Sequence, residues 1–190
     1  MSDGDSVATT ARDTETDADS DFDDDVVMVA DISLKLETTL EFWKRTEPRF
    51  SSVYEATLRD DRISWDLSPS TVVDNVEKQL EHCTSVINAI LAKGYVHGLK
   101  IGITYLVYER FIGSRIGYAH HGYKGLVVMS VHWDADVIAL IERRLLDIFR
   151  RYDRRGQYLG NGHMLCKNRA PGGESASHGF APHFCYVAVM

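Results

Sequence analysis

Residues 135–151 read ADVIALIERRLLDIFRR, and the rest of the chain is organised around this stretch. Its apolar side chains recur every three or four residues, as they do on the buried side of a helix: Ile138, Ile141, Leu145, Ile148 and Phe149. Asp134 stands just before the stretch, where an aspartate can cap the first free backbone N–H groups of a helix. The pattern therefore predicts a helix that packs one face against a hydrophobic core.

Glu142 is expected on the apolar side of this helix, because it follows Ile138 by four residues and precedes Leu145 by three. Burying an unpaired charge is costly, so a carboxylate in this place either reaches water or meets a cation. An ion pair with an arginine is the commoner case for a single carboxylate, and a metal or catalytic role is the alternative. The pattern alone leaves both interpretations open.

The 190-residue chain has a formal net charge of −7, but its acidic residues are concentrated at one end. Residues 1–25 contain ten acidic side chains and a single base, Arg12, and the rest of the chain is mildly basic. Because so polar a segment cannot bury enough apolar surface to offset its ordering entropy, we predict that residues 1–25 form a disordered acidic tail.

The sequence predicts no membrane partner. Its apolar runs are shorter than the roughly 20 residues that a membrane-spanning helix needs, and its acidic N-terminus differs from the basic start of a signal peptide. The three cysteines, Cys83, Cys166 and Cys185, are too few and too scattered for a disulfide framework. We therefore expect a soluble, intracellular protein.

Residues 26–94 are predicted to form a mainly helical N-terminal extension. Helical periodicity is present in residues 32–46, which end just before Pro48, and again from about residue 71 up to Gly94. Between these helices, alternating apolar residues predict a hairpin that turns at Asp60-Asp61.

Residues 95–190 alternate between strand and helix patterns. Strands are expected at residues 99–104, 125–131 and 184–189, with a short helix after the first strand and the long helix after the second. The fold class is therefore predicted as α+β, with a small mixed or antiparallel three-stranded sheet flanked by helices.

Five features follow one another in this half of the chain. They are the motif Lys-Ile-Gly-Ile-Thr at residues 100–104, Arg110, an apolar strand, Glu142 in an Ile-Glu pair, and Asn168 shortly before Gly172-Gly173. In this order they resemble the GIY-YIG nuclease superfamily, in the divergent branch whose second motif reads Lys-Ile-Gly-Ile-Thr. The resemblance covers about residues 95–190 and implies a GIY-YIG-like domain there.

The resemblance implies metal-dependent hydrolysis of a nucleic-acid phosphodiester bond, with DNA as the expected substrate. Glu142 would then ligate Mg²⁺ or Mn²⁺, Arg110 would stabilise negative charge on the phosphate, and Asn168 would help to orient the site. A tyrosine would take a proton from the attacking water. These residue types suit their roles, since cations act where negative charge develops and a positioned base activates a weak nucleophile.

Further residues are candidates for substrate binding. Lys100 would contact a phosphate or lie in solvent, and Gly102 would let a ligand or another backbone come close. Gly172-Gly173 would admit a phosphate or form a simple turn. Arg115 competes with Arg110 for the phosphate role, and Arg110 is preferred because its spacing from the motif fits the family better.

The chain departs from the family at the tyrosine. Leu99-Lys100 stands where many members have the tyrosine of the second motif, and no strand with Gly-Ile-Tyr precedes it. Tyr95 is one candidate for the base, and Tyr186 is the other if the final strand takes the place of the missing one. For either, a purely structural tyrosine is the commoner case. Tyr118 and Tyr123 are interpreted as packing residues.

The sequence leaves several functions open. Arg110, Glu142 and Asn168 together favour a metal-dependent endonuclease. The missing tyrosine favours a catalytically inactive module that binds nucleic acid or a protein partner. A structural interaction protein would be indicated if Glu142 paired with Arg110 or Arg115 in a closed interior. A zinc site is disfavoured, because the residues with suitable chemistry lack a Cys-x-x-Cys pair: Cys166, His178, His183 and Cys185.

Overall fold

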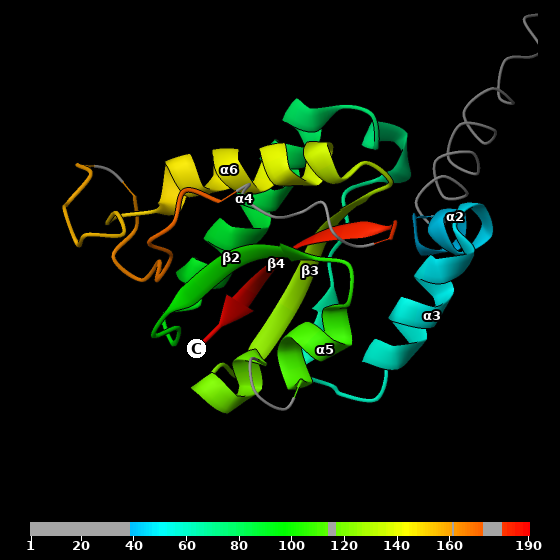
Figure 1. Ribbon diagram of the computed structural model, residues 1–190, viewed down its shortest axis with the longest axis horizontal. Coiled ribbons are helices and arrows are strands. Elements are labelled where there is room, and N and C mark those ends of the chain that lie inside the picture. Colours follow the sequence, from blue (N-terminus) through cyan, green and yellow to red (C-terminus); the bar gives the residue numbers. More distant parts are fainter. Residues whose placement is uncertain (1–38, 114–116, 161, 173–179) are drawn as a thin grey trace, which may run out of the picture. The chain divides into compact units, whose positions relative to one another are not determined.

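The computed structural model describes residues 39–113, 117–160, 162–172 and 180–190, in which helices and strands alternate (Figure 1). The predicted α+β class is confirmed. The elements are the helices α2 (Thr39–Thr46), α3 (Pro48–Thr57), α4 (Val76–Ala92), α5 (Val107–Ile112) and α6 (Ala135–Phe149), the 3₁₀ turns η1 (Ser70–Val72) and η2 (Tyr118–His121), and the strands β1 (Ile63–Trp65), β2 (Leu99–Thr104), β3 (Gly125–His132) and β4 (His183–Val189).

The described residues form one mixed sheet of four strands in the order β1-β3-β4-β2, so the predicted three-stranded sheet is wrong. The additional strand is β1, which pairs in parallel with β3 from Ile63 opposite Leu126 to Trp65 opposite Val128. The hairpin predicted around Asp60-Asp61 is also wrong. Most of its first half is helix α3, because Pro48 occupies the first turn and the Glu47 side chain caps it by accepting from the Arg49 N–H.

The final strand β4 lies at the centre of the sheet. It is antiparallel to β2 on one side and to β3 on the other. Its side chains alternate between two layers, with Phe184 and Tyr186 on one side and Cys185 and Val187 on the other. The strand predicted at residues 184–189 is therefore confirmed.

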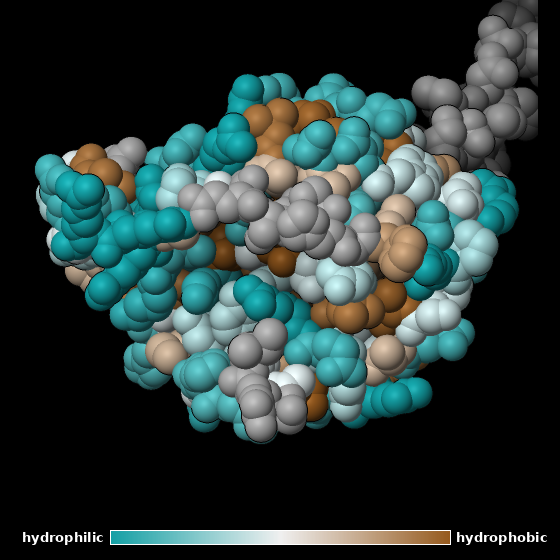
Figure 2. Space-filling model, viewed as in Figure 1, coloured by the Kyte–Doolittle hydropathy of each residue, from teal (hydrophilic) through white to brown (hydrophobic). Residues whose placement is uncertain are grey.

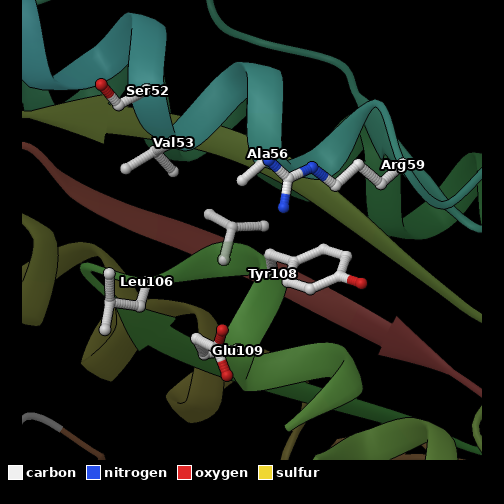
Figure 3. A pocket seen from close by; sticks show the side chains of 8 residues that line it. Ser52, Val53, Ala56, Arg59, Leu106, Tyr108 and Glu109 are labelled. Atoms are coloured by element: carbon white, nitrogen blue, oxygen red, sulfur yellow. The ribbon is translucent and has the colours of Figure 1, made fainter.

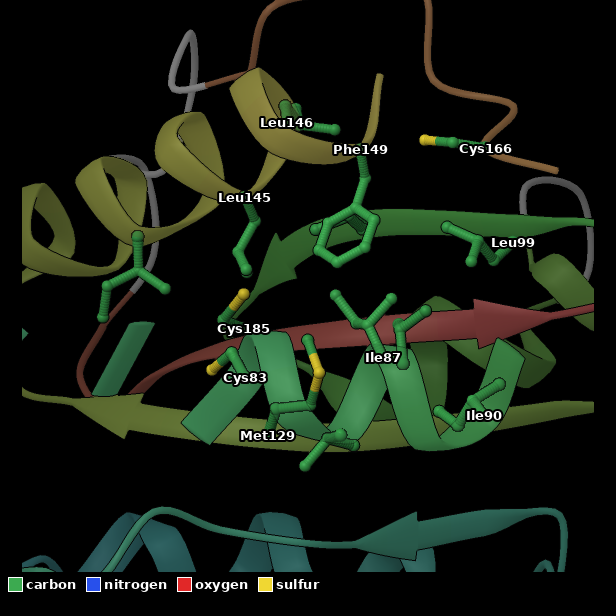
Figure 4. Packing of buried hydrophobic residues seen from close by; sticks show 14 of the residues in the cluster. Cys83, Ile87, Ile90, Leu99, Met129, Leu145, Leu146, Phe149, Cys166 and Cys185 are labelled. Carbon is green, nitrogen blue, oxygen red and sulfur yellow. The ribbon is translucent and has the colours of Figure 1, made fainter. Parts of the chain in front are cut away.

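Helices cover both faces of the sheet. On one face α4 and α6 pack over β2, β3 and β4, and Figure 4 shows Cys185 of β4 between Cys83 of α4 and Leu145 of α6. On the other face α2, α3 and α5 pack around a largely aromatic cluster that includes Trp43, Phe50, Phe111 and Phe184. Strand β2 is an edge strand of this sheet, at the opposite end from β1.

Helix α6 begins as predicted, since the Asp134 carboxylate accepts a hydrogen bond of 2.8 Å from the Asp136 N–H. It ends at Phe149, two residues earlier than predicted. The inclusion of Ile148 in the buried stripe was wrong. The Ile148 side chain is 44% exposed, whereas Leu146, which the prediction left out, is buried.

The structure describes only part of the N-terminal half of the chain. The predicted tail of residues 1–25 lies outside the described residues, as do residues 26–38. The domain boundary predicted between residues 94 and 95 remains a prediction. Elements before and after this boundary contact each other, since β1 pairs with β3 and α4 packs against α6. Within the described part of the chain, no helix is both long enough and apolar enough to cross a membrane.

Candidate functional site

A cavity of about 190 Å³ lies beside the edge strand β2 and brings together residues from distant parts of the chain. The lining residues come from β2, α5, η2, α6 and the segment after α6: Lys100, Ile101, Gly102, Ile103, Arg110, Tyr118, Glu142, Asn168, Ala170 and Gly172. Six of the residues that the sequence singled out for a site are therefore neighbours in space, namely Lys100, Gly102, Arg110, Glu142, Asn168 and Gly172.

The position at a sheet edge explains how these groups meet. Side chains of a strand alternate between its faces, so Ile101 and Ile103 of β2 pack toward α4 and α6 while Lys100 and Gly102 lie toward α5 and η2. Among the described residues, no further strand lies on the outer side of β2, so groups from both helical layers can reach its edge. Arg110 and Tyr118 arrive from one layer and Glu142 from the other.

Arg110 is held in place by two tyrosines. Its Nε–H donates to the Tyr186 hydroxyl at 2.8 Å, and its Nη2–H donates to the Tyr118 hydroxyl at 3.4 Å. Burial alone would lower the pKa of Arg110, but its interactions with Tyr186 and Tyr118 outweigh burial and the net direction is upward. The guanidinium therefore carries its positive charge into the cavity in a fixed orientation.

Tyr186 contacts both Arg110 and Tyr118 through its hydroxyl group. It is fully buried, and its hydroxyl donates to the Tyr118 hydroxyl at 3.0 Å. Burial and, next, the neighbouring Tyr118 raise the pKa of Tyr186 well above its ordinary value, against the opposing effect of Arg110. Tyr186 thus stays a neutral hydroxyl at physiological pH and is poorly suited to act as a base.

Gly102 is needed because the Tyr186 ring lies directly over it. A Cβ atom at Gly102 would collide with the Tyr186 hydroxyl and lie 2.7 Å from Cζ of the ring. A close approach was predicted at this glycine, but the group that approaches is this side chain and not a ligand or a second backbone. Gly102 therefore contributes to the cavity by allowing Tyr186 to hold Arg110.

Tyr118 is the cavity residue that the sequence analysis missed. Its hydroxyl accepts from both Arg110 and Tyr186, and its ring lies 5.6 Å from Nζ of Lys100. No spacing in the sequence could have found it, because Tyr118 meets Tyr186, which is far away in the sequence, only through the fold. It was taken for a packing residue.

Glu142 lies on the cavity side of α6 and is only 8% exposed. The backbone of Gly172 passes close to it: a Cβ there would be 3.0 Å from Oε2 of Glu142 and 2.6 Å from Cδ1 of Leu146. Gly172 also has a positive φ of 77°, which favours glycine. The carboxylate is thus enclosed by the loop that carries Asn168 and Gly172.

Asn168 holds the edge of β2. Its Nδ2 donates to the Ile101 carbonyl, its Oδ1 accepts from the Ile101 N–H, and both distances are 2.8 Å. The preceding residues continue this pairing, since Leu99 N–H donates to Leu165 O and Lys167 N–H donates to Leu99 O. Asn168 therefore positions the strand that carries Lys100 and Gly102.

Asn168→Asp tests this positioning role, because it keeps the shape of the side chain but removes the donor to the Ile101 carbonyl. We expect a loss of stability of about 1 to 3 kcal/mol, since a buried carbonyl would face an unmatched carboxylate. Thermal unfolding measures the change, with Asn88→Asp on the exposed side of α4 as the matched control. Equal melting temperatures for the two variants would show that the two hydrogen bonds between Asn168 and Ile101 contribute nothing to stability.

Three of the predicted site residues are not seen at the cavity. Tyr95 is 66% exposed between α4 and β2 and does not belong to the lining. Arg115 and Gly173 lie outside the described residues. Of the two tyrosines predicted as bases, only Tyr186 approaches the site, and it does so as a buried support for Arg110.

Glu142 is the acidic residue among those that line the cavity. Among the described residues, no three His, Cys, Asp or Glu side chains gather where they could hold a metal together, so Cys166, His183 and Cys185 form no zinc site with one another. His178 lies outside the described part. Mg²⁺ needs fewer protein ligands, because it keeps several waters and often binds through one carboxylate and substrate phosphates. Glu142 can supply that carboxylate.

A second hollow lies between α3 and α5 (Figure 3). Its lining is mostly apolar, with Val53, Ala56 and Leu106 facing the space and Arg59 and Glu109 as its charged residues. None of the residues predicted for catalysis or metal binding lines it. The cavity beside β2 is therefore the stronger candidate for a reaction site.

Comparison with protein-family models, curated proteins and solved structures finds no match for this chain. The resemblance to GIY-YIG nucleases accordingly stays a prediction from sequence. Any functional proposal has to rest on the residues of the cavity and their geometry.

Proposed function

We propose that the protein is a metal-dependent phosphodiesterase that cleaves nucleic acid, with the cavity beside β2 as its active site. The observation that carries this proposal is the meeting of Arg110, Glu142 and Asn168, which are far apart in sequence, in one cavity that also contains Lys100. The combination supplies positive charge for a phosphate and a carboxylate for a divalent cation. Nucleic acid, with DNA as the first expectation, provides such phosphates.

Arg110 stabilises the charge that develops on the phosphate. Two of its five N–H groups donate to the hydroxyls of Tyr186 and Tyr118. These bonds fix the guanidinium before substrate arrives, so little reorganisation is needed during the reaction. Lys100 adds a second positive charge on the same side of β2.

Glu142 is the residue that would hold Mg²⁺ or Mn²⁺, since carboxylate oxygens suit both ions. When bound, such an ion neutralises phosphate charge and makes water a better nucleophile. Glu142 projects from the buried face of α6, whose apolar side chains on that face pack in the core and hold the helix in place beside the cavity.

Tyr118 is the best placed tyrosine for taking a proton from water. It lines the cavity, whereas Tyr186 is buried with a raised pKa and Tyr95 lies outside the lining. To take this proton Tyr118 must first have given up its own to solvent, and the hydrogen bonds that Arg110 and Tyr186 donate to its oxygen would stabilise the negative charge until the proton from water neutralises it. Tyr118 therefore takes the role that the family assigns to a motif tyrosine.

Tyr118→Phe should slow cleavage of labelled DNA by about 100-fold or more, because positioned acid–base groups contribute about 10² to 10⁴ in rate. Tyr123→Phe is the matched control, since its ring lies 5.0 Å from that of Tyr118 but does not line the cavity. Single-turnover rates with Mg²⁺ or Mn²⁺ measure both variants. If Tyr118→Phe cleaves as fast as Tyr123→Phe, Tyr118 is not the base.

The second candidate is an inactive module of the same architecture that binds nucleic acid or a protein partner. It is favoured by one observation: neither Tyr95 nor Tyr186, the tyrosines predicted as bases, is suitably placed to accept a proton in the cavity. Such a module would bind DNA without cleaving it in either metal. The cleavage assay therefore separates the two functions directly.

A further inference from the structure

The segment after α6 folds into a small hairpin at residues 151–159, with the sequence RYDRRGQYL. Tyr152 and Tyr158 pair across it in an antiparallel bridge, and the Leu159 N–H donates to Arg151 O at 3.0 Å. The Asp153 carboxylate closes the turn by accepting from the N–H groups of Arg155 and Gln157 at 2.9 and 2.8 Å. We call residues 151–159 the Arg–Tyr hairpin.

The surface of the Arg–Tyr hairpin is both basic and aromatic. Tyr152 and Tyr158 are 39% and 55% exposed, and their ring centroids lie 5.7 Å apart. The Arg151 guanidinium carbon lies 5.4 and 5.3 Å from these centroids, and Arg154 and Arg155 are exposed at the turn. The only acidic side chain, Asp153, is engaged by the turn. Figure 2 shows a largely hydrophilic surface over this segment.

The Arg–Tyr hairpin is connected to the cavity in two ways. It follows α6, and Glu142 lies about 10 Å from the end of this helix along the helix axis. In addition, Nη1 of Arg150 donates at 3.2 Å to the carbonyl of Arg169, which lies between the cavity residues Asn168 and Ala170. The loop that lines the cavity is thus tied to the residue that directly precedes the hairpin.

We propose that the Arg–Tyr hairpin binds a single-stranded flank of the nucleic acid whose phosphate occupies the cavity. Its arginines contact phosphates, and Tyr152 and Tyr158 stack with unpaired bases. A single strand is specified because the bases of a duplex already stack on one another and present no free face. The link to the cavity rests on the proposed function, but binding by the hairpin does not require hydrolysis.

The test uses the full chain in the presence of EDTA, with fluorescence anisotropy of a labelled oligodeoxythymidine as the probe. Replacing both tyrosines by alanine (Tyr152→Ala with Tyr158→Ala) should raise Kd about tenfold or more, because base stacking on aromatic side chains is lost. Replacing both by phenylalanine should keep Kd close to that of wild type. Arg155→Gln should weaken binding and lower the slope of log Kd against log salt by about one.

Phe180→Ala is the matched control, because Phe180 is a 73% exposed aromatic residue that stacks on Arg49 outside the hairpin. It should bind like wild type. The proposal is overturned if the double alanine variant also binds like wild type, if Phe180→Ala weakens binding equally, or if wild type prefers duplex DNA to the single strand.

Cleavage is measured separately, with Mg²⁺ or Mn²⁺ in the buffer. Hairpin-dependent binding by a wild-type protein that never cleaves would support the hairpin proposal and contradict the proposed hydrolysis. Metal-dependent cleavage, combined with binding that does not change when both tyrosines are replaced, would support the proposed hydrolysis and contradict the hairpin proposal. The two proposals therefore fail by different results.

Discussion

Glu142→Gln should abolish magnesium- and manganese-dependent cleavage while leaving the protein folded. The amide keeps the shape of the side chain but removes the negative charge that would hold the cation, and the Lewis-acid contribution of a metal is worth several kcal/mol in the transition state. We expect the rate to fall by about 1,000-fold or more, which corresponds to about 4 kcal/mol.

The unfolding temperature without metal separates this role from a structural ion pair. If Glu142 serves a metal, the variant without metal should melt close to the wild-type temperature, because glutamine keeps the length of the side chain and an oxygen that can accept hydrogen bonds. Loss of one partner of a buried ion pair would instead destabilise the protein by about 3 to 5 kcal/mol. Glu81→Gln, on the exposed side of α4, controls for the charge change itself. Severe destabilisation specific to Glu142→Gln would favour the ion pair.

Deleting residues 183–190 should abolish cooperative folding. This deletion removes β4, which pairs with β2 on one side and β3 on the other, so two strand ladders are lost together. It also removes buried side chains such as Phe184, Tyr186 and Val187, each worth about 1.5 to 3 kcal/mol in burial. The total is comparable to the whole stability of a typical domain, about 5 to 15 kcal/mol.

Circular dichroism during heating measures this effect, and removal of Met190 alone is the control. Met190 lies beyond β4 and makes backbone bonds to His97 and Gly98, so its loss should lower the melting temperature only slightly. A cooperative transition at the wild-type temperature after deletion of residues 183–190 would contradict the central place of β4 in the sheet.

The elements with a regular pattern could be predicted from the sequence. Helix α6 has a three-and-four apolar repeat and an aspartate at its start, and the strands β2, β3 and β4 are apolar runs with clear ends. Strand β1 has three residues, too few for a pattern, and its parallel partner lies some sixty residues away. Pro48 was interpreted as the stop after one helix, although it stands in the first turn of α3.

The cavity was predictable only in part, for similar reasons. Arg110, Glu142 and Asn168 follow a motif order that a sequence can display. The place of Tyr118 depends on the Tyr186 hydroxyl, which comes from the opposite end of the domain through the central strand. The Asn168 side chain can form its two hydrogen bonds with the Ile101 backbone because β2 is an edge strand. No local sequence pattern specifies which strand lies at the edge of a sheet.

The most direct test of the central claim is nicking of a supercoiled plasmid by the full-length protein, with Glu142→Gln purified in parallel to detect contaminating nucleases. The cavity proposal predicts nicking by wild type with Mg²⁺ or Mn²⁺, none in EDTA, and none by Glu142→Gln in either metal. Nicking by Glu142→Gln at the wild-type rate, or its absence from wild type in both metals, would contradict the assignment of this cavity as a phosphodiesterase site.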